Sequence, residues 1–210
     1  MKAWSEYHPK AKLMARKRAE ILDAARQAFL RSGYEGASME GIAAAAGVSI
    51  MTLYRHAESK DDLFAAVILE ACDHAPDAHH ADTTALMQRP LKEVLVEVGG
   101  LFQEKLTRPD TIALFRIVMV ETSRFPHLAE AAYRGFVQSW EDGLDAFFSQ
   151  RVEFNDVEAR GRRDLIASFL DDLIGTDMLR MLCGLAGASA GDRERRSDAA
   201  AEKLLAALRG

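Results

Sequence analysis

The chain has 210 residues, enough to bury one large or two small hydrophobic cores without disulfide bonds. Hydrophobic residues make up 49% and charged residues 28%, a balance that excludes fibrous and low-complexity proteins. The net charge is −5, yet residues 1–60 hold 10 basic and 6 acidic residues while the rest holds 17 and 26. A basic N-terminal part on an acidic body is typical of a protein that binds a polyphosphate such as DNA. A solvated charged tail gives the same distribution.

The sequence shows no membrane or secretory segment. Its apolar stretches are far shorter than the roughly 20 residues of a membrane span, and no apolar segment follows the basic N-terminal residues. Cys72 and Cys183 are too few for a disulfide framework and lack the spacing of a metal or redox pair. We therefore expect a cytoplasmic protein with no membrane partner.

Helical periodicity dominates the chain, and no run of residues has the alternation of a strand, so we expect an all-α fold. A first helix is expected over residues 14–32, where Ile21, Ala25 and Phe29 share one face and Gly33 ends the pattern. Three shorter helices should follow, each with a serine at its N-terminal cap, over residues 38–46, 49–56 and 59–72.

A connector follows these helices. Residues 74–89 are polar and nearly devoid of large apolar side chains, and prolines lie at positions 76 and 90. We expect two domains, residues 1–73 and 74–210. Helices are predicted in the second at residues 91–107, at 110–123, after Pro126, at 157–186 and at 192–208.

Residues 39–58, MEGIAAAAGVSIMTLYRHAE, have the spacing of a helix-turn-helix. Such a motif needs a small residue where its helices touch and a glycine in the turn, and Ala43 and Gly47 fit these demands. Its second helix would enter the major groove of DNA with its N-terminal residues toward base edges. Two ordinary amphipathic helices of a core are the alternative.

The segment GVSIMTLYRHAESKDDLF, residues 47–64, resembles the signature of the TetR family of bacterial repressors, and residues 21–43 resemble the helices that precede it. The resemblance implies that Thr52, Tyr54 and His56 contact phosphates, with Lys60 beside them. Met51 stands where the family has glycine, and its side chain would meet a thymine methyl group. The DNA-binding residues we expect are Ser38, Ser49, Ile50, Met51, Thr52, Tyr54, Arg55, His56 and Lys60.

A replaced core residue and a basic N-terminal stretch also bear on DNA binding. Ala57 replaces the phenylalanine of the family and leaves a smaller core anchor. Five basic residues between Lys10 and Arg18 would track the DNA backbone or minor groove, or form a solvated tail.

Residues 115–136 are similar to TetR regulators with an AefR-like C-terminal region, and this resemblance implies a domain that binds an effector and dimerises. Bulky side chains would line a pocket for a small, largely apolar molecule, although ordinary core packing gives the same pattern. The expected pocket residues are Phe102, Leu106, Phe115, Arg116, Met119, His127, Phe136, Trp140 and Phe147. The expected dimer interface consists of Leu165, Phe169, Leu173, Met178, Met181, Leu204 and Leu208.

Two other sequence patterns do not indicate a catalytic or metal site. GASAG, residues 187–191, fits the nucleophile-elbow pattern, but helix precedes Ser189 and no histidine follows it. A cluster of His74, His79, His80 and Asp82 lacks a fixed metal-ligand spacing. We expect no enzyme, no cofactor and no metal.

The sequence thus predicts a ligand-responsive transcriptional repressor, a nucleoid-associated homodimer bound to a pseudo-palindromic DNA operator. The alternative is a non-inducible architectural DNA-binding protein whose C-terminal domain only dimerises.

Overall fold

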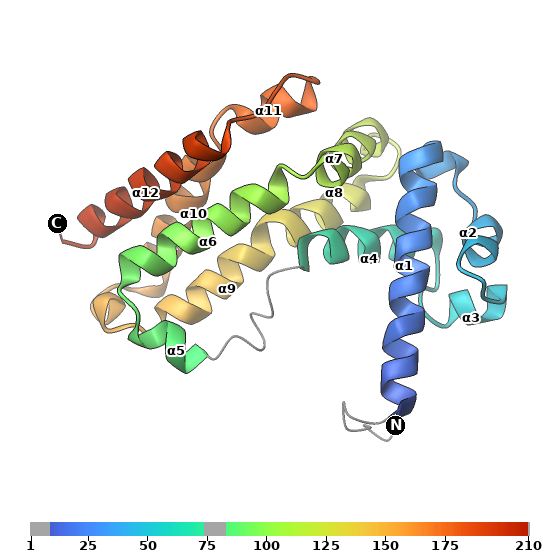
Figure 1. Cartoon of the computed structure of the whole chain (residues 1–210), viewed down its shortest axis with the longest axis horizontal. Coiled ribbons are helices and arrows are strands. Elements are labelled where there is room, and N and C mark those ends of the chain that lie inside the picture. Colours follow the sequence, from blue (N-terminus) through green and yellow to red (C-terminus); the bar gives the residue numbers. More distant parts are fainter. Residues whose placement is uncertain (1–8, 74–82, 210) are drawn as a thin grey trace. The chain divides into compact units, whose positions relative to one another are not determined.

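The computed structural model describes residues 9–73 and 83–209, and all regular structure within these ranges is helical (Figure 1). The chain forms two compact units. The first comprises the described residues up to Glu70 together with Leu114–Ala132, and the second comprises Ala71–Ala113 and Tyr133–Gly210. Residues 114–132, which composition assigns to the second domain, therefore group with the first unit. The all-α fold expected from the periodicity is confirmed.

The first unit begins with four helices: α1 (Pro9–Gly36), α2 (Met39–Ala45), α3 (Ile50–Tyr54) and α4 (Lys60–Asp73). The regular part of α1 ends where predicted, because Gly33 takes a positive φ of 71°. Its start at Pro9 lies before the expected residue 14. An aromatic cluster forms the core of the unit, with the Phe64 ring centroid 4.8 Å from Phe29 and 5.3 Å from Tyr34.

The turn between α7 (Pro109–Glu121) and α8 (Pro126–Tyr133) also belongs to the first unit. The Phe125 ring packs on Tyr34 at 4.8 Å between centroids. Arg124 forms an ion pair with Glu35 at 2.5 Å. These contacts connect the ends of α1 and α7, which lie about 90 residues apart in sequence.

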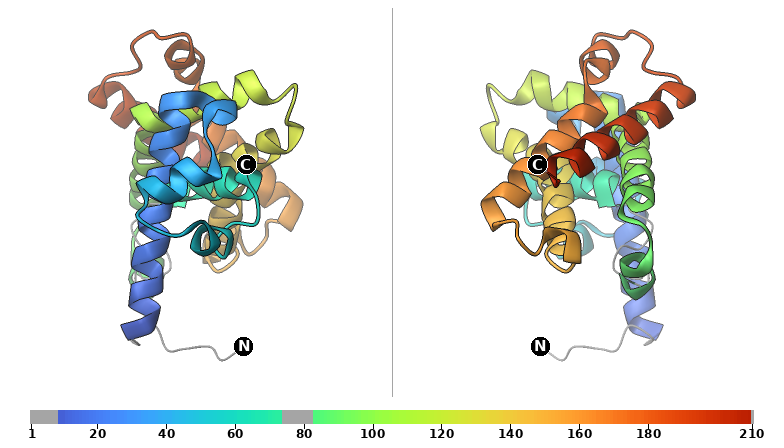
Figure 2. Two further views of the ribbon diagram at one scale, coloured as in Figure 1. Left: turned by 90° about the vertical axis from the view of Figure 1, so that its right-hand side faces the viewer. Right: turned by 90° about the vertical axis from the view of Figure 1, so that its left-hand side faces the viewer.

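The remaining elements build the second unit: α5 (Thr83–Gln88), α6 (Leu91–Leu106), a π-helical turn η1 (Arg134–Gln138), α9 (Ser139–Phe148), a short 3-10 helix η2 (Val152–Phe154), α10 (Ala159–Ile174), α11 (Asp177–Leu182) and α12 (Ala190–Ala207). Helices α6, α10 and α12 pack on one another, and α9 packs on α10 (Figure 2). Buried apolar residues from each of these helices form the core, among them Phe102, Phe148, Phe169 and Leu204.

Two predicted helices and the predicted connector differ from the observed structure. The helix expected over residues 157–186 is broken at Gly175, whose φ of 52° ends α10 and lets the chain turn into α11. The helix expected after Pro126 contains the π-helical turn η1. Part of the expected connector forms α5, while residues 74–82 lie outside the described part.

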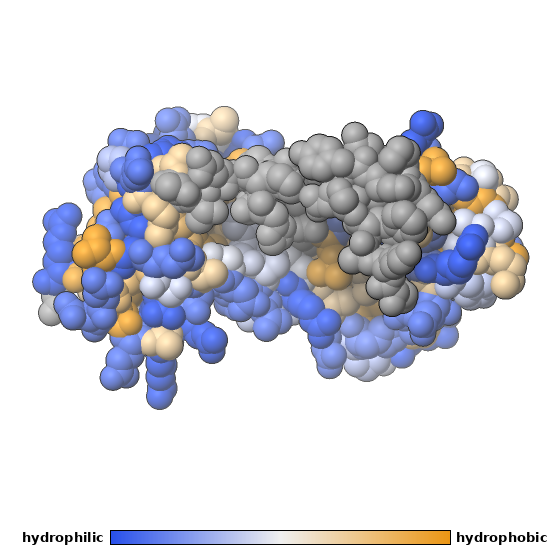
Figure 3. Space-filling view, turned by 90° about the horizontal axis from the view of Figure 1, so that it is seen from below, coloured by the Kyte–Doolittle hydropathy of each residue, from blue (hydrophilic) through white to orange (hydrophobic). Residues whose placement is uncertain are grey.

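The surface seen in Figure 3 is mostly hydrophilic, with apolar residues in small separate patches. In the described part of the chain, no helix is both long and apolar enough to cross a membrane.

Neighbouring glycines of α6 give a test of the packing in the second unit. A Cβ on Gly99 would lie 2.9 Å from Leu173 Cδ2 and 3.0 Å from Ser197 Oγ, whereas a Cβ on Gly100 would meet nothing within 4 Å. We expect Gly99→Ala to lower the free energy of unfolding by about 1–3 kcal/mol through overpacking. Gly100→Ala is the matched control and should raise it by up to about 1 kcal/mol through helix propensity.

Urea denaturation of the two variants measures this difference. Equal stability of the two variants would contradict the close approach of α6, α10 and α12 at Gly99.

Candidate nucleic-acid interface

Helices α2 and α3 are fixed by local caps and a tight turn. Ser38 Oγ accepts a hydrogen bond from the Gly41 backbone N–H at 3.1 Å, which caps α2 as predicted. Gly47 has a φ of 62°, and the Val48 N–H donates to the Ala43 carbonyl at 3.0 Å, so the turn closes α2 in the manner of a Schellman motif. The sequence therefore determines the geometry of this pair locally.

Helix α3 is short, and only one of its residues is fully buried. Leu53 is inaccessible to solvent and anchors the helix, while Met51 is 71% exposed and Tyr54 43% exposed. Ala57, which follows α3, is also buried. An exposed methionine and tyrosine on a capped helix have no packing role, so this face is available to a partner.

A chain of hydrogen bonds follows the exposed face of α3. Ser49 Oγ caps the helix by accepting from the Thr52 N–H at 3.2 Å, and it lies 2.9 Å from Thr52 Oγ1. Arg55 Nη2 in turn donates to Thr52 Oγ1 at 3.1 Å. Thr52 thereby restricts the orientation of the Arg55 guanidinium, the group best suited to pair with guanine.

His56 follows α3 and lies within electrostatic range of three basic residues. Partial burial lowers the pKa of His56, and the positive charges of Arg18, Arg55 and Lys17 lower it further. These effects disfavour the charged imidazolium, and an anion beside it would act in the opposite direction and raise the pKa. Lys17 and Arg18 lie on α1, and Arg55 is the C-terminal cap of α3.

Lys60 has protein partners at the start of α4. Its Nζ donates to the carbonyl oxygens of Tyr34 at 2.8 Å, Ala37 at 3.2 Å and Glu35 at 3.3 Å. The ammonium also lies 4.5 Å from the centroid of the Tyr34 ring. These oxygens lie at the C-terminal end of α1 and on Ala37 just after it, where a positive charge stabilises the helix. In this structure Lys60 joins α4 to α1 rather than pointing into solvent.

The residues expected to line an effector pocket are divided between the two units. In the second unit, Phe102, Leu106 and Phe136 are buried, and the half-buried Trp140 packs edge-on against Phe102 at 5.2 Å. Phe147 of the same unit is half-buried and Phe115 of the first unit is half-buried. Arg116 and Met119 are exposed, and His127 Nε2 lies 2.9 Å from Asp61 Oδ2.

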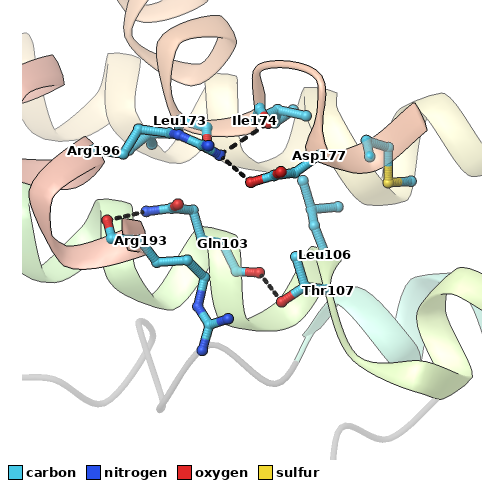
Figure 4. Close-up of a pocket in the computed structure, with 9 residues that line it drawn as sticks. Gln103, Leu106, Thr107, Leu173, Ile174, Asp177, Arg193 and Arg196 are labelled. Atoms are coloured by element: carbon cyan, nitrogen blue, oxygen red, sulfur yellow. Dashed lines mark hydrogen bonds and ion pairs between the residues drawn. The ribbon is translucent and has the colours of Figure 1, made fainter. Parts of the chain in front are cut away.

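A small cavity of the second unit lies beside Leu106, one of these expected residues (Figure 4). Buried Gln103 donates through Nε2 to Ser197 Oγ at 2.8 Å and to the Arg193 carbonyl at 2.9 Å. Opposite it, Arg196 pairs with Asp177 at 2.7 Å. The cavity has a volume of about 10 Å³, whereas ligand pockets reach about 300–1,000 Å³. An effector would have to enlarge it.

The expected dimer residues fall into two groups. Phe169, Leu173 and Leu204 are buried within a single chain and belong to the core of the second unit. The other four are only half-buried and remain candidates for a contact with a second chain: Leu165, Met178, Met181 and Leu208.

The GASAG segment has a structural role at the start of a helix. Ser189 of the GASAG segment caps α12 in a capping box with Asp192. No group of three potential metal ligands occurs among the described residues, and His74, His79, His80 and Asp82 lie outside them. Sequence reasoning missed the contacts of Gln103, Arg196 and Asp177, because their partners lie on helices far apart in sequence.

Both parts of the chain match known protein families. Residues 21–67 match the family described as bacterial regulatory proteins, tetR family, and residues 93–207 match the C-terminal domain of AefR-like transcriptional repressors. The HTH-type transcriptional regulator UidR of Escherichia coli K12 is 41% identical over 58 residues, which span 28% of this chain and 30% of UidR. The chain therefore matches less than a third of the length of this curated relative.

Solved structures extend the similarity to most of the chain. A TetR-family transcriptional regulator from Mesorhizobium loti MAFF303099 has a TM-score of 0.72 and 27% identity, covering 92% of this chain and 96% of that one. The flavonoid-responsive regulator FrrA has a TM-score of 0.66 and 27% identity, covering 92% and 97%. With a family match over more than half of its length and a helix-turn-helix in place, this chain belongs to the TetR family of DNA-binding transcriptional regulators.

Proposed function

We propose that this chain is a homodimeric repressor that binds a pseudo-palindromic operator through α3 and leaves it when a small, largely apolar effector binds the second unit. The observation that carries the DNA-binding role is the exposed face of α3, which presents Met51, Tyr54 and Arg55 on a helix held by Ser49 and Leu53. These side chains are exposed and not packed in the core, so they are accessible to a partner.

The proposed roles follow from the chemistry of each group. Thr52, Tyr54 and His56 would donate hydrogen bonds to phosphate oxygens, which position the helix without reading sequence. Arg55 would pair with a guanine edge and Met51 would contact a thymine methyl group. In a dimer, the two α3 helices would read half-sites about 34–36 Å apart.

The relatives support a response to a ligand. FrrA is named as flavonoid-responsive, and C-terminal domains of TetR regulators typically bind ligands and dimerise. The packed pair of Phe102 and Trp140, together with the buried Phe136, would supply the apolar surface. An effector that lowers operator affinity tenfold must bind the released form more tightly by about 1.4 kcal/mol.

Genomic-fragment selection tests the DNA-binding role. Purified protein is mixed with fragmented DNA of its source at two salt concentrations, and the retained fragments are sequenced. We expect a palindromic motif that is retained at the higher salt. Retention without a shared motif, lost steeply with salt, would instead indicate binding to the backbone alone and an architectural protein.

The effector response is tested on the selected operator with a panel of aromatic compounds that includes the flavonoid naringenin. We expect at least one compound to weaken operator binding tenfold or more and to raise the melting temperature of the protein. Trp140→Ala should remove this response and keep operator affinity, while the exposed control Tyr133→Ala should keep both. A panel without any effect on binding or melting would contradict the ligand-responsive role.

Lys60 allows a structural role to be separated from a phosphate contact. Because its ammonium holds three carbonyls of α1, we expect Lys60→Met to lower the free energy of unfolding by about 1–3 kcal/mol. Lys17→Met, in the same unit but without such partners, should change it by less than about 0.5 kcal/mol. Urea denaturation measures both. If Lys60→Met keeps the stability of the wild type and binds all DNA sequences more weakly, then Lys60 contacts phosphates and does not stabilise the fold.

A further inference from the structure

Helix α1 begins well before the part of the chain that matches the TetR family. The helix starts at Pro9, and the family match starts at residue 21. The buried side of α1 also begins at Ile21 and Leu22, whereas residues 13–20 are all exposed, with Leu13 at 55% and Met14 at 57%. We call residues 13–20 the basic extension. Its side chains add nothing to the core of the first unit.

The basic extension carries two cations without an acidic partner. Arg16 pairs with Glu20 at 2.8 Å, and Glu20 is the only acidic residue of the segment. Among the residues that the structure describes, Lys17 and Arg18 form no ion pair and no hydrogen bond through their side chains. Such charges contribute little to the stability of a solvated helix turn, so they are accessible to a partner.

The position of the basic extension relative to α3 indicates which partner. Both helices belong to the first unit, and the N-terminal turns of α1 extend past α3 (Figures 1 and 2). Lys17 and Arg18 lie close enough to His56 for their charges to act on its imidazole. These two cations of α1 therefore lie within electrostatic range of a residue that follows α3 directly.

We propose that the basic extension binds the DNA phosphate backbone beside the groove that α3 enters. This proposal rests on the DNA-binding role of α3. A helix with its side chains is about 10–12 Å wide, and the minor groove is about 6 Å wide, so the extension lies along the phosphates instead of entering that groove. It would add affinity for every sequence equally, because phosphates carry no sequence information.

A matched pair of arginines on α1 tests the proposal. Arg18→Gln removes a charge from the extension, and Arg31→Gln removes the same charge from an exposed site about 20 Å further along the helix. Affinity is measured across a salt series for the selected operator and for a mixed-sequence duplex of the same length. We expect Arg18→Gln to weaken both complexes by the same factor and to reduce the salt slope by about 1 per protomer. Arg31→Gln should leave both unchanged.

Shortening the DNA gives a second measurement. On duplexes trimmed to the bases under the two α3 helices, wild-type affinity should fall to that of Lys17→Gln/Arg18→Gln, because the flanking phosphates are absent. Circular dichroism and melting establish that each variant is folded. Equal behaviour of Arg18→Gln and Arg31→Gln on long duplexes would overturn the proposal, whereas a wild-type protein that retains no duplex would overturn the DNA-binding role itself.

A membrane surface is the other partner that a basic helix suits, and the same variants distinguish it. Binding to vesicles of one-third anionic lipid should be equal for wild type, Arg18→Gln and Arg31→Gln. Loss of vesicle binding in Arg18→Gln, with DNA binding unchanged, would replace the phosphate backbone by a lipid surface as the partner.

Discussion

The contact of Lys60 with the end of α1 holds the DNA-binding helices in place. Its three carbonyl partners lie at residues 34–37, and the segment between them and Lys60 contains all of α2 and α3. Helix α3 has five residues and one fully buried side chain, too little to be stable alone. Its orientation therefore depends on the two ends of this segment being joined, by the Lys60 hydrogen bonds and by the Phe29, Tyr34 and Phe64 cluster beneath them.

The second unit uses the same interaction at its helix ends. Buried Arg151 donates to the carbonyls of Met87 at 2.8 Å and Arg89 at 3.0 Å, at the end of α5, and pairs with Glu153. Arg196 donates to the carbonyls of Leu173 and Ile174, at the end of α10. An all-helical fold leaves carbonyls without partners at each helix C-terminus, and a cation from a distant segment satisfies them while fixing that segment.

This division between local and distant interactions explains what the sequence could predict. The caps at Ser38 and Ser49 and the turns at Gly33 and Gly47 depend on neighbouring residues, so their pattern predicted the helix-turn-helix. The break at Gly175, the contacts of residues 114–132 with the first unit and the partners of Lys60 depend on segments far apart in sequence. The helical pattern of the sequence continues through Gly175 without interruption. The sequence also does not distinguish a lysine that contacts a phosphate from one that donates to a backbone carbonyl, as Lys60 does.

The roles of Lys60 and of the basic extension are complementary. The Lys60 ammonium already donates to three carbonyls. A phosphate contact would add little binding free energy, because it would have to replace one of these hydrogen bonds. Within the described ranges Lys17 and Arg18 make no such bonds, and Glu20, the nearest acidic residue in sequence, pairs with Arg16. Their backbone is already ordered in α1, so binding to DNA would cost little backbone conformational entropy. Under the proposed function, the charge nearest to His56 that could meet phosphates comes from Lys17 and Arg18 of α1 and from Arg55 at the end of α3.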